Sequence, residues 1–157
     1  MRVEHEPSTE VDLLIRRPVD EVFQAFVDPE ITTRFWFTKS SGKLEPGADV
    51  RWEWKMYDVS ATVRVKEFEE NSRILIEWDP DSLEEIECEW RFFSGEDDTT
   101  LVRITETGYK GSGDEIVARA IDSHVGFAFV LAALKALLEH DVELTIVADS
   151  HPEGFDS

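Results

Sequence analysis

The chain has 157 residues, of which 41% are apolar and 32% charged, as is typical of one globular domain. Its 35 acidic residues against 16 Lys and Arg give a formal net charge of −19. We therefore expect neither nucleic acid nor an anionic membrane surface as a partner. Cys88 is the single cysteine, which excludes an internal disulfide and a cysteine-based zinc site. The apolar stretch around residues 125–134 is shorter than a membrane span and no leader opens the chain, so a cytoplasmic protein is expected.

The acidic residues are spread along the whole chain and not gathered in a tail. Molar salt shortens the Debye length to about 3 Å and so screens repulsion between like charges. One hypothesis is therefore adaptation to a salty cytoplasm. The alternative is an ordinary acidic protein.

The first predicted elements are one strand and two helices. Val11, Leu13 and Ile15 alternate with polar neighbours, the pattern of a half-buried strand. A helix is predicted from Pro18, because acidic residues occupy its first turn and apolar residues follow at helical spacing. Asp28 is expected to cap a second, short helix that ends in residues 35–37.

Five further strands are predicted after a loop over residues 38–49. Each alternates apolar and charged residues, which indicates one covered and one exposed face. Their short connections favour antiparallel pairing of neighbours. The predicted strands are 50–56, 61–65, 74–78, 86–92 and 101–105.

A long helix is predicted to cover the apolar face of this sheet. Residues 112–115 (SGDE) form a capping box, and the helical pattern continues to about His140. The expected fold class is α+β: a curved antiparallel sheet of about six strands wrapped on a long C-terminal helix, with two short helices after the first strand. We expect a flexible arm at 1–8, one domain at 9–142 and a tail at 143–157, with 142–147 apolar enough to pack. The predicted apolar stripe of the helix is Ile116, Ala120, Ile121, Phe127, Leu131, Leu134 and Leu138.

Several of these segments resemble one protein superfamily. Residues 18–30 (PVDEVFQAFVDPE), 35–37 (FWF) and 47–52 (GADVRW) resemble the opening of the SRPBCC superfamily, also called START-like or helix-grip. Within it they are similar to the branch named for the ATPase activator of the 90-kDa heat-shock chaperone. The C-terminal helix matches this branch at Gly126-Phe127, Leu131, Leu134-Lys135 and Leu138-Glu139. Phe127 stands where the branch usually has Trp, and His140-Asp141 where Gly often caps the helix.

The resemblance implies an apolar cavity between the sheet and the long helix. Many helix-grip proteins bind lipids, sterols, polyketides or plant hormones there, some are cyclases or hydrolases, and others act by protein contact. The first hypothesis is therefore non-catalytic binding of an unidentified small hydrophobic ligand. The alternatives are a protein-interaction or chaperone-associated domain, and a cyclase or hydrolase that uses the same cavity.

Tryptophans are the first candidates for the walls of such a cavity. Trp54, Trp78 and Trp90 fall on the apolar side of their strands, where an indole supplies both area and a hydrogen-bond donor. Trp36 is expected near the entrance. The alternative is that these rings fill the core and leave no cavity.

His124 and Phe127 are the candidates on the long helix. His124 lies three residues after Ile121 and three before Phe127, so it is expected to face the sheet as a ligand contact or as a hydrogen-bonded boundary residue. The histidines show no metal-ligand spacing, and no nucleophile or phosphate-loop motif is present. We therefore expect no catalytic residue, metal or cofactor.

Overall fold

The computed structural model describes residues 7–150 and 152. Its sheet has seven strands in the order β1-β7-β6-β5-β4-β3-β2, and every neighbouring pair is antiparallel. The strands are β1 (Thr9–Ile15), β2 (Lys39–Ser40), β3 (Asp49–Trp54), β4 (Val59–Glu69), β5 (Arg73–Trp78), β6 (Glu87–Ser94) and β7 (Thr100–Thr107). The α+β helix-grip prediction is confirmed, with one strand more than expected. The extra strand, β2, has two residues inside the predicted loop and is too short to show an alternating pattern.

Four α-helices and one 3-10 turn complete the described chain. The helices are α1 (Val19–Val27), α2 (Pro29–Thr32), α3 (Gly113–His140) and α4 (Ile146–Asp149), and the turn is η1 (Lys55–Tyr57). The predicted caps are confirmed. The Asp28 carboxylate accepts from the Glu30 N–H at 3.0 Å, and the Ser112 hydroxyl accepts from the Glu115 N–H at 3.2 Å, so each satisfies a free backbone donor at a helix start.

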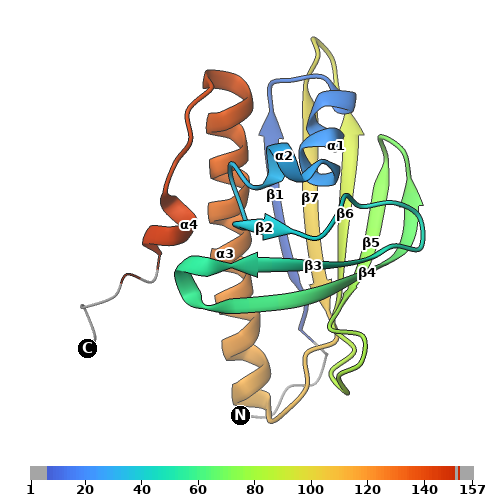
Figure 1. Cartoon of the computed structure of the whole chain (residues 1–157), viewed down its shortest axis with the longest axis vertical. Helices are drawn as coiled ribbons and strands as arrows, with labels where there is room; N and C mark the ends of the chain where they lie inside the picture. The colour runs from blue at the N-terminus through green and yellow to red at the C-terminus, as the bar shows by residue number, and fades with distance from the viewer. Residues whose placement is uncertain (1–6, 151, 153–157) are drawn as a thin grey trace.

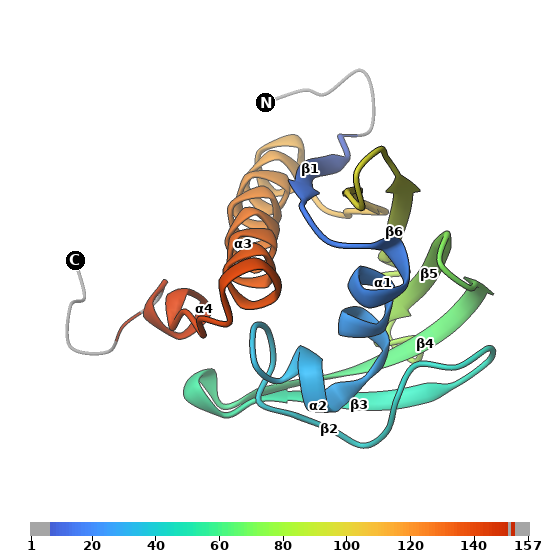
Figure 2. The same ribbon diagram turned by 90° about the horizontal axis from the view of Figure 1, so that it is seen from above.

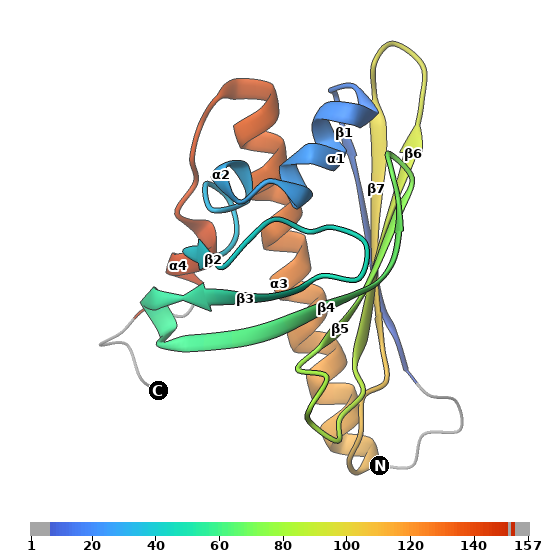
Figure 3. The same ribbon diagram turned by 45° about the vertical axis from the view of Figure 1, so that its right-hand side comes forward.

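The sheet curves around the first two helices, and α3 closes the open side. Figure 2 shows α1 and α2 inside the curve with α3 beside them. Figure 3 shows the long β3–β4 hairpin bending away from the upright β1, β7 and β6. A register shift in β4 between Val65 and Glu67 interrupts its pairing with β5, and such a bulge bends and twists a strand.

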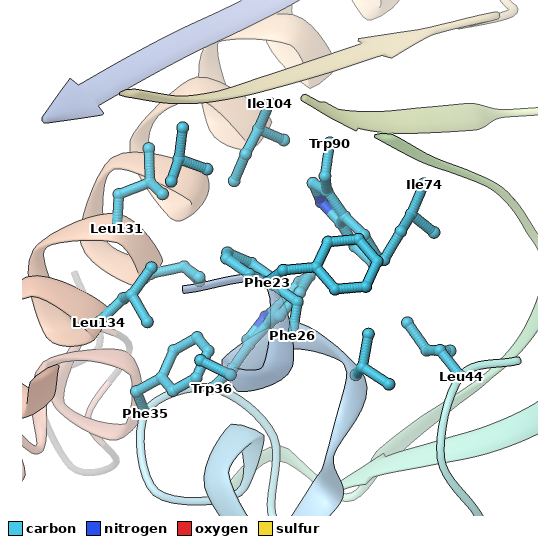
Figure 4. Packing of buried hydrophobic residues seen from close by; sticks show 14 of the residues in the cluster. Phe23, Phe26, Phe35, Trp36, Leu44, Ile74, Trp90, Ile104, Leu131 and Leu134 are labelled. Atoms are coloured by element: carbon cyan, nitrogen blue, oxygen red, sulfur yellow. The ribbon is translucent and has the colours of Figure 1, made fainter. Parts of the chain in front are cut away.

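Aromatic rings fill the centre of the space between sheet and α3 (Figure 4). Trp90 is 0% and Trp52 1% exposed, and their rings stack with centroids 6.0 Å apart. The ring centroid of Phe26 from α1 lies 5.5 Å from that of Trp90, and the ring centroid of Trp36 lies 5.1 Å from that of Trp52. Of the two alternatives for the tryptophans, core packing holds for these inner rings, so the centre of the grip is a packed core.

The two halves of α3 are buried to different degrees. Its buried residues all lie in the second half: Phe127, Val130, Leu131, Ala133, Leu134 and Leu137. The predicted stripe is therefore wrong at Ile121, which is 61% exposed. The first half lies along β1, where the Thr9 hydroxyl donates to the Ala120 carbonyl at 3.0 Å. By length and composition alone α3 could cross a membrane, contrary to the expectation from residues 125–134, although a core helix meets the same criterion.

The C-terminal tail folds back along α3. Asp141 ends the helix with φ of 52°, the left-handed conformation that Gly usually supplies and that Asp tolerates. Arg34 pairs with Asp141 at 3.2 Å and with Glu143 at 3.5 Å. The chain then descends to α4 beside the middle of α3 (Figure 1). The packing predicted for 142–147 holds for Ile146 and Val147, which contact the core, but not for Val142 and Leu144, which are exposed. The expected arm at 1–8 lies mostly outside the described residues.

Candidate functional site

A pocket of about 270 Å³ lies between the middle of α3, the tail and the tip of the β3–β4 hairpin. Its walls are mostly apolar and aromatic, with four oxygen-bearing side chains. The lining residues are Trp36, Tyr57, Asp122, Ser123, Val125, Gly126, Phe127, Phe129, Val130, Val147 and Ser150. An apolar cavity with a few polar groups is the usual form of a small-molecule site.

Two local features leave this space open. Gly126 brings no side chain to the wall, and a Cβ added there would meet no atom within 4 Å. Across the pocket, the Tyr57 and Ser150 hydroxyls lie 3.0 Å apart and join the hairpin tip to the end of α4. The reversal of the chain at Asp141 therefore places the tail as the outer wall.

A buried carboxylate lies behind the inner wall. Glu106 on β7 is 6% exposed and accepts from the Trp78 indole N–H at 2.8 Å and from the Ser123 hydroxyl at 2.8 Å. The Tyr109 hydroxyl lies 3.0 Å from Glu106 and 2.7 Å from the Thr9 hydroxyl. Among the described residues no Lys or Arg forms an ion pair with Glu106. Neutral donors from β5, α3 and the β7–α3 loop therefore satisfy this buried group.

Burial also changes the acidity of two groups near Glu106. Burial raises the pKa of Tyr109 to about 12, and the nearby Glu106 charge acts in the same direction, whereas the hydrogen bond with Thr9 opposes it. Burial raises the pKa of the Cys88 thiol well above its usual value. A protonated, fully buried thiol is chemically inert, so Cys88 is a small apolar residue of the core.

The structure separates five of the six predicted ligand contacts into three groups. Trp36 and Phe127 line the pocket. Trp54 and Trp78 are half-buried and lie behind Trp36, with ring centroids at 6.4 Å and 6.3 Å from its ring. Trp90 lies in the core, and its indole N–H has no hydrogen-bond partner among the described residues.

The expected orientation of His124 is wrong, since its side chain is exposed and does not line the pocket. Successive residues of an α-helix are 100° apart around its axis. Ser123 and Phe127, four residues apart, share the inner face, so His124 points sideways into solvent. Its proposed part in ligand binding therefore has no support from its position.

Nine of the eleven lining residues were not among the predicted contacts, including Tyr57, Ser123 and Phe129, and neither was Glu106 behind the wall. Glu106 carried a signal, because it continues the inward alternation of Val102 and Ile104 and is a charged residue at a buried position. Ser123 and Phe129 belong to α3, whose inner face was predicted to include Ile121 and His124 instead. Tyr57 carried no local signal, because its role depends on a contact 93 residues away.

No metal-binding cluster is present in the described part of the chain, where no group of three or more His, Cys, Asp or Glu could hold an ion. The pocket also contains no Lys, Arg or His among its described lining residues. What the arrangement offers is an apolar surface with side-chain oxygen atoms contributed by α3, the hairpin tip and the tail.

A curved antiparallel sheet gripped by a long C-terminal helix defines the helix-grip class, and comparison with known families gives the branch. The family model described as Activator of Hsp90 ATPase homolog 1-like protein matches residues 16–139. The chain belongs to this family. The matched region ends before Asp141, so α4 and the outer wall of the pocket lie beyond it. No match was found among curated proteins.

Solved structures share the fold over most of the chain. A Staphylococcus saprophyticus protein is 28% identical, with a TM-score of 0.74 and coverage of 88% of this chain and 96% of its own. The Aha1 protein of Colwellia psychrerythraea, solved as a dimer, is 18% identical, with a TM-score of 0.73 and coverage of 85% and 97%. An HSP90 activator of Plasmodium falciparum is also 18% identical, with a TM-score of 0.67 and coverage of 84% and 96%.

Proposed function

We propose that this protein binds a small hydrophobic ligand, without catalysing a reaction, in the pocket between α3, the tail and the β3–β4 hairpin. The observation that carries the proposal is a pocket walled by Trp36, Phe127 and Phe129 next to a glycine. The expected cavity at the centre of the grip is filled by rings, so the proposed site lies at the margin of the core.

The volume limits the size of the ligand. A pocket of about 270 Å³ equals roughly nine water volumes at ~30 Å³ each. A ligand of about ten non-hydrogen atoms therefore fits without opening the tail. 1-Octanol is a suitable probe, because it is neutral and has an eight-carbon body.

The test is calorimetric titration of the protein with 1-octanol, with the tryptophan emission followed in parallel because Trp36 lines the site. We expect a dissociation constant between micromolar and millimolar, worth ~4–8 kcal/mol. Gly126→Leu fills the pocket from within and should weaken binding at least tenfold. Replacing a helical glycine also removes a cost of about 0.5–1 kcal/mol, so this variant should fold at least as well as the wild type.

The matched control is Ala118→Leu, which enlarges an exposed residue of the same helix outside the pocket. Its octanol affinity should equal that of the wild type. Absence of saturable binding, or an equal loss in both leucine variants, would overturn the proposal.

A second candidate is protein contact, the mode of action that the family's name suggests. Apolar side chains are exposed beside the pocket on α3 and on the hairpin: Ile121, Val125, Met56 and Val59. Such a group of side chains can serve as a contact surface. Native mass spectrometry of the purified protein separates the candidates, because a retained small molecule supports ligand binding and a co-purified chaperone supports protein contact.

A further inference from the structure

We infer that the ligand carries a protonated amine on its apolar body, and that the pocket discriminates against carboxylates such as fatty acids. The inference rests on the proposed function, because it names the ligand class of the same pocket. It follows from the hydrogen bonds of the hydroxyl groups in the pocket wall, which donate their protons to acceptors inside the protein.

Three hydroxyl groups line the pocket, and each proton is already donated inside the protein. Ser123 donates to the Glu106 carboxylate at 2.8 Å. Ser150 donates to the Val147 carbonyl at 2.8 Å. The 3.0 Å contact between the hydroxyls of Tyr57 and Ser150 must then be donated by Tyr57. Ser123 and Ser150 therefore have lone pairs, and no free hydroxyl proton, to offer to a ligand.

Glu106 holds Ser123 in this state. A carboxylate can only accept from the serine hydroxyl, and Glu106 is itself held in place by Trp78 at 2.8 Å. Rotating the Ser123 hydroxyl toward a ligand acceptor would take away one of the donors of a buried carboxylate, which is costly. Glu106 therefore acts as a positioning residue that fixes Ser123 as an acceptor.

The charged group in the pocket wall also favours a cationic ligand over an anionic one. Asp122 lines the pocket, and its carboxylate has no ion pair or hydrogen bond with the rest of the described chain. No Lys or Arg is among the described lining residues, and the indole N–H of Trp36 is a neutral donor. An anionic ligand would thus enter beside an unpaired carboxylate with no cation to neutralise it. A protonated amine meets lone pairs, a carboxylate and aromatic rings, all of which attract cations.

The net charge of −19 attracts any cation, so the test must separate the pocket from the general field. It compares octylamine, 1-octanol and octanoate, which share an eight-carbon chain, by calorimetry at pH 7.5 and 0.15 M NaCl, where the Debye length is about 8 Å. Asp122→Asn removes the charge in the wall. Asp98→Asn removes one charge from an exposed loop outside the pocket.

Octylamine should bind at least tenfold more tightly than octanoate, with octanol between them. Asp122→Asn should weaken the affinity for octylamine at least threefold and leave the affinity for octanol within twofold of the wild type. Asp98→Asn should change neither affinity. Octanoate binding as tightly as octylamine, or equal effects of the two asparagine variants, would overturn the inference while octanol binding still supported the pocket. Failure of octanol itself to bind would instead remove the proposed function.

Discussion

The indole N–H of Trp78 on β5 donates a 2.8 Å hydrogen bond to Glu106 on β7, two strands away in the sheet. Cys88 on β6, the strand between them, pairs directly with Glu106 in the backbone register. Glu106 also accepts from Ser123, and this second bond ties the sheet to the first half of α3, where no side chain is fully buried. The first half of the helix is thus held by polar contacts and the second by apolar packing.

Replacement of the buried carboxylate should therefore be destabilising. Glu106→Ala leaves Trp78 and Ser123 without their acceptor, and each stranded donor costs about 1–3 kcal/mol. We expect a loss of at least ~2 kcal/mol in urea denaturation. Glu87→Ala, on the opposite face of the sheet, removes only a partly exposed ion pair with Lys66 and should cost less than about 1 kcal/mol. Similar losses of stability in the two variants would show that the hydrogen bonds of Glu106 do not stabilise the fold.

Tyr109 should make stability fall in alkaline solution. Its pKa is about 12 in the folded protein and about 10 in an unfolded chain. The folded state therefore holds the phenol proton over a range where the unfolded state releases it, so this stabilisation is complete below pH 10 and is lost toward pH 12. Denaturation series at pH 9 to 11.5 should show a steeper decline for the wild type than for Tyr109→Phe. If the stability of both proteins declined equally with pH, the alkaline loss could not be assigned to Tyr109.

The second half of α3 should respond to truncation much more than the first. Leu131 is 1% exposed within the core, so Leu131→Ala should cost ~2–5 kcal/mol by opening a cavity. Ile121→Ala makes a comparable truncation on the same helix at a side chain that is 61% exposed, and should change stability by only about 0.5 kcal/mol. Chemical denaturation measures both. A loss below about 1 kcal/mol at Leu131 would refute the core placement.

Salt should stabilise the protein. Ion pairs lie on the outer face of the sheet, such as Arg64 with Asp49 at 2.9 Å and Arg103 with Asp12 at 3.1 Å. They cannot compensate all the acidic residues, because 35 Asp and Glu against 16 Lys and Arg leave a net charge of −19. Screening of the remaining repulsion should raise the melting temperature as NaCl rises from low to molar concentration, with most of the gain by ~1 M, where the Debye length is about 3 Å. A flat or falling curve would remove the hypothesis of adaptation to high salt.

Local patterns were sufficient for the fold class and for most of the elements, although β2 was missed and the second helix, predicted to end in residues 35–37, ends at Thr32. Alternation along the strands, the caps at Asp28 and Ser112, and the apolar spacing of Phe127, Leu131 and Leu134 each depend on residues close in the chain. Burial on one face imposes period two on a strand and period 3.6 on a helix, so a single sequence carries this information. The family motifs lie on these same scaffold positions.

The site depended on contacts that local patterns do not encode. Ser123 meets Glu106 and Tyr57 meets Ser150 across 17 and 93 residues. The outward orientation of Ile121 and His124 follows from where α3 crosses the sheet, and a stripe drawn on an isolated helix cannot supply that angle. Whether the tryptophans would fill the grip or line a cavity depended on the curvature of β4 and the return of the tail. The fold could thus be read from periodicity, whereas the pocket arises only where distant segments meet.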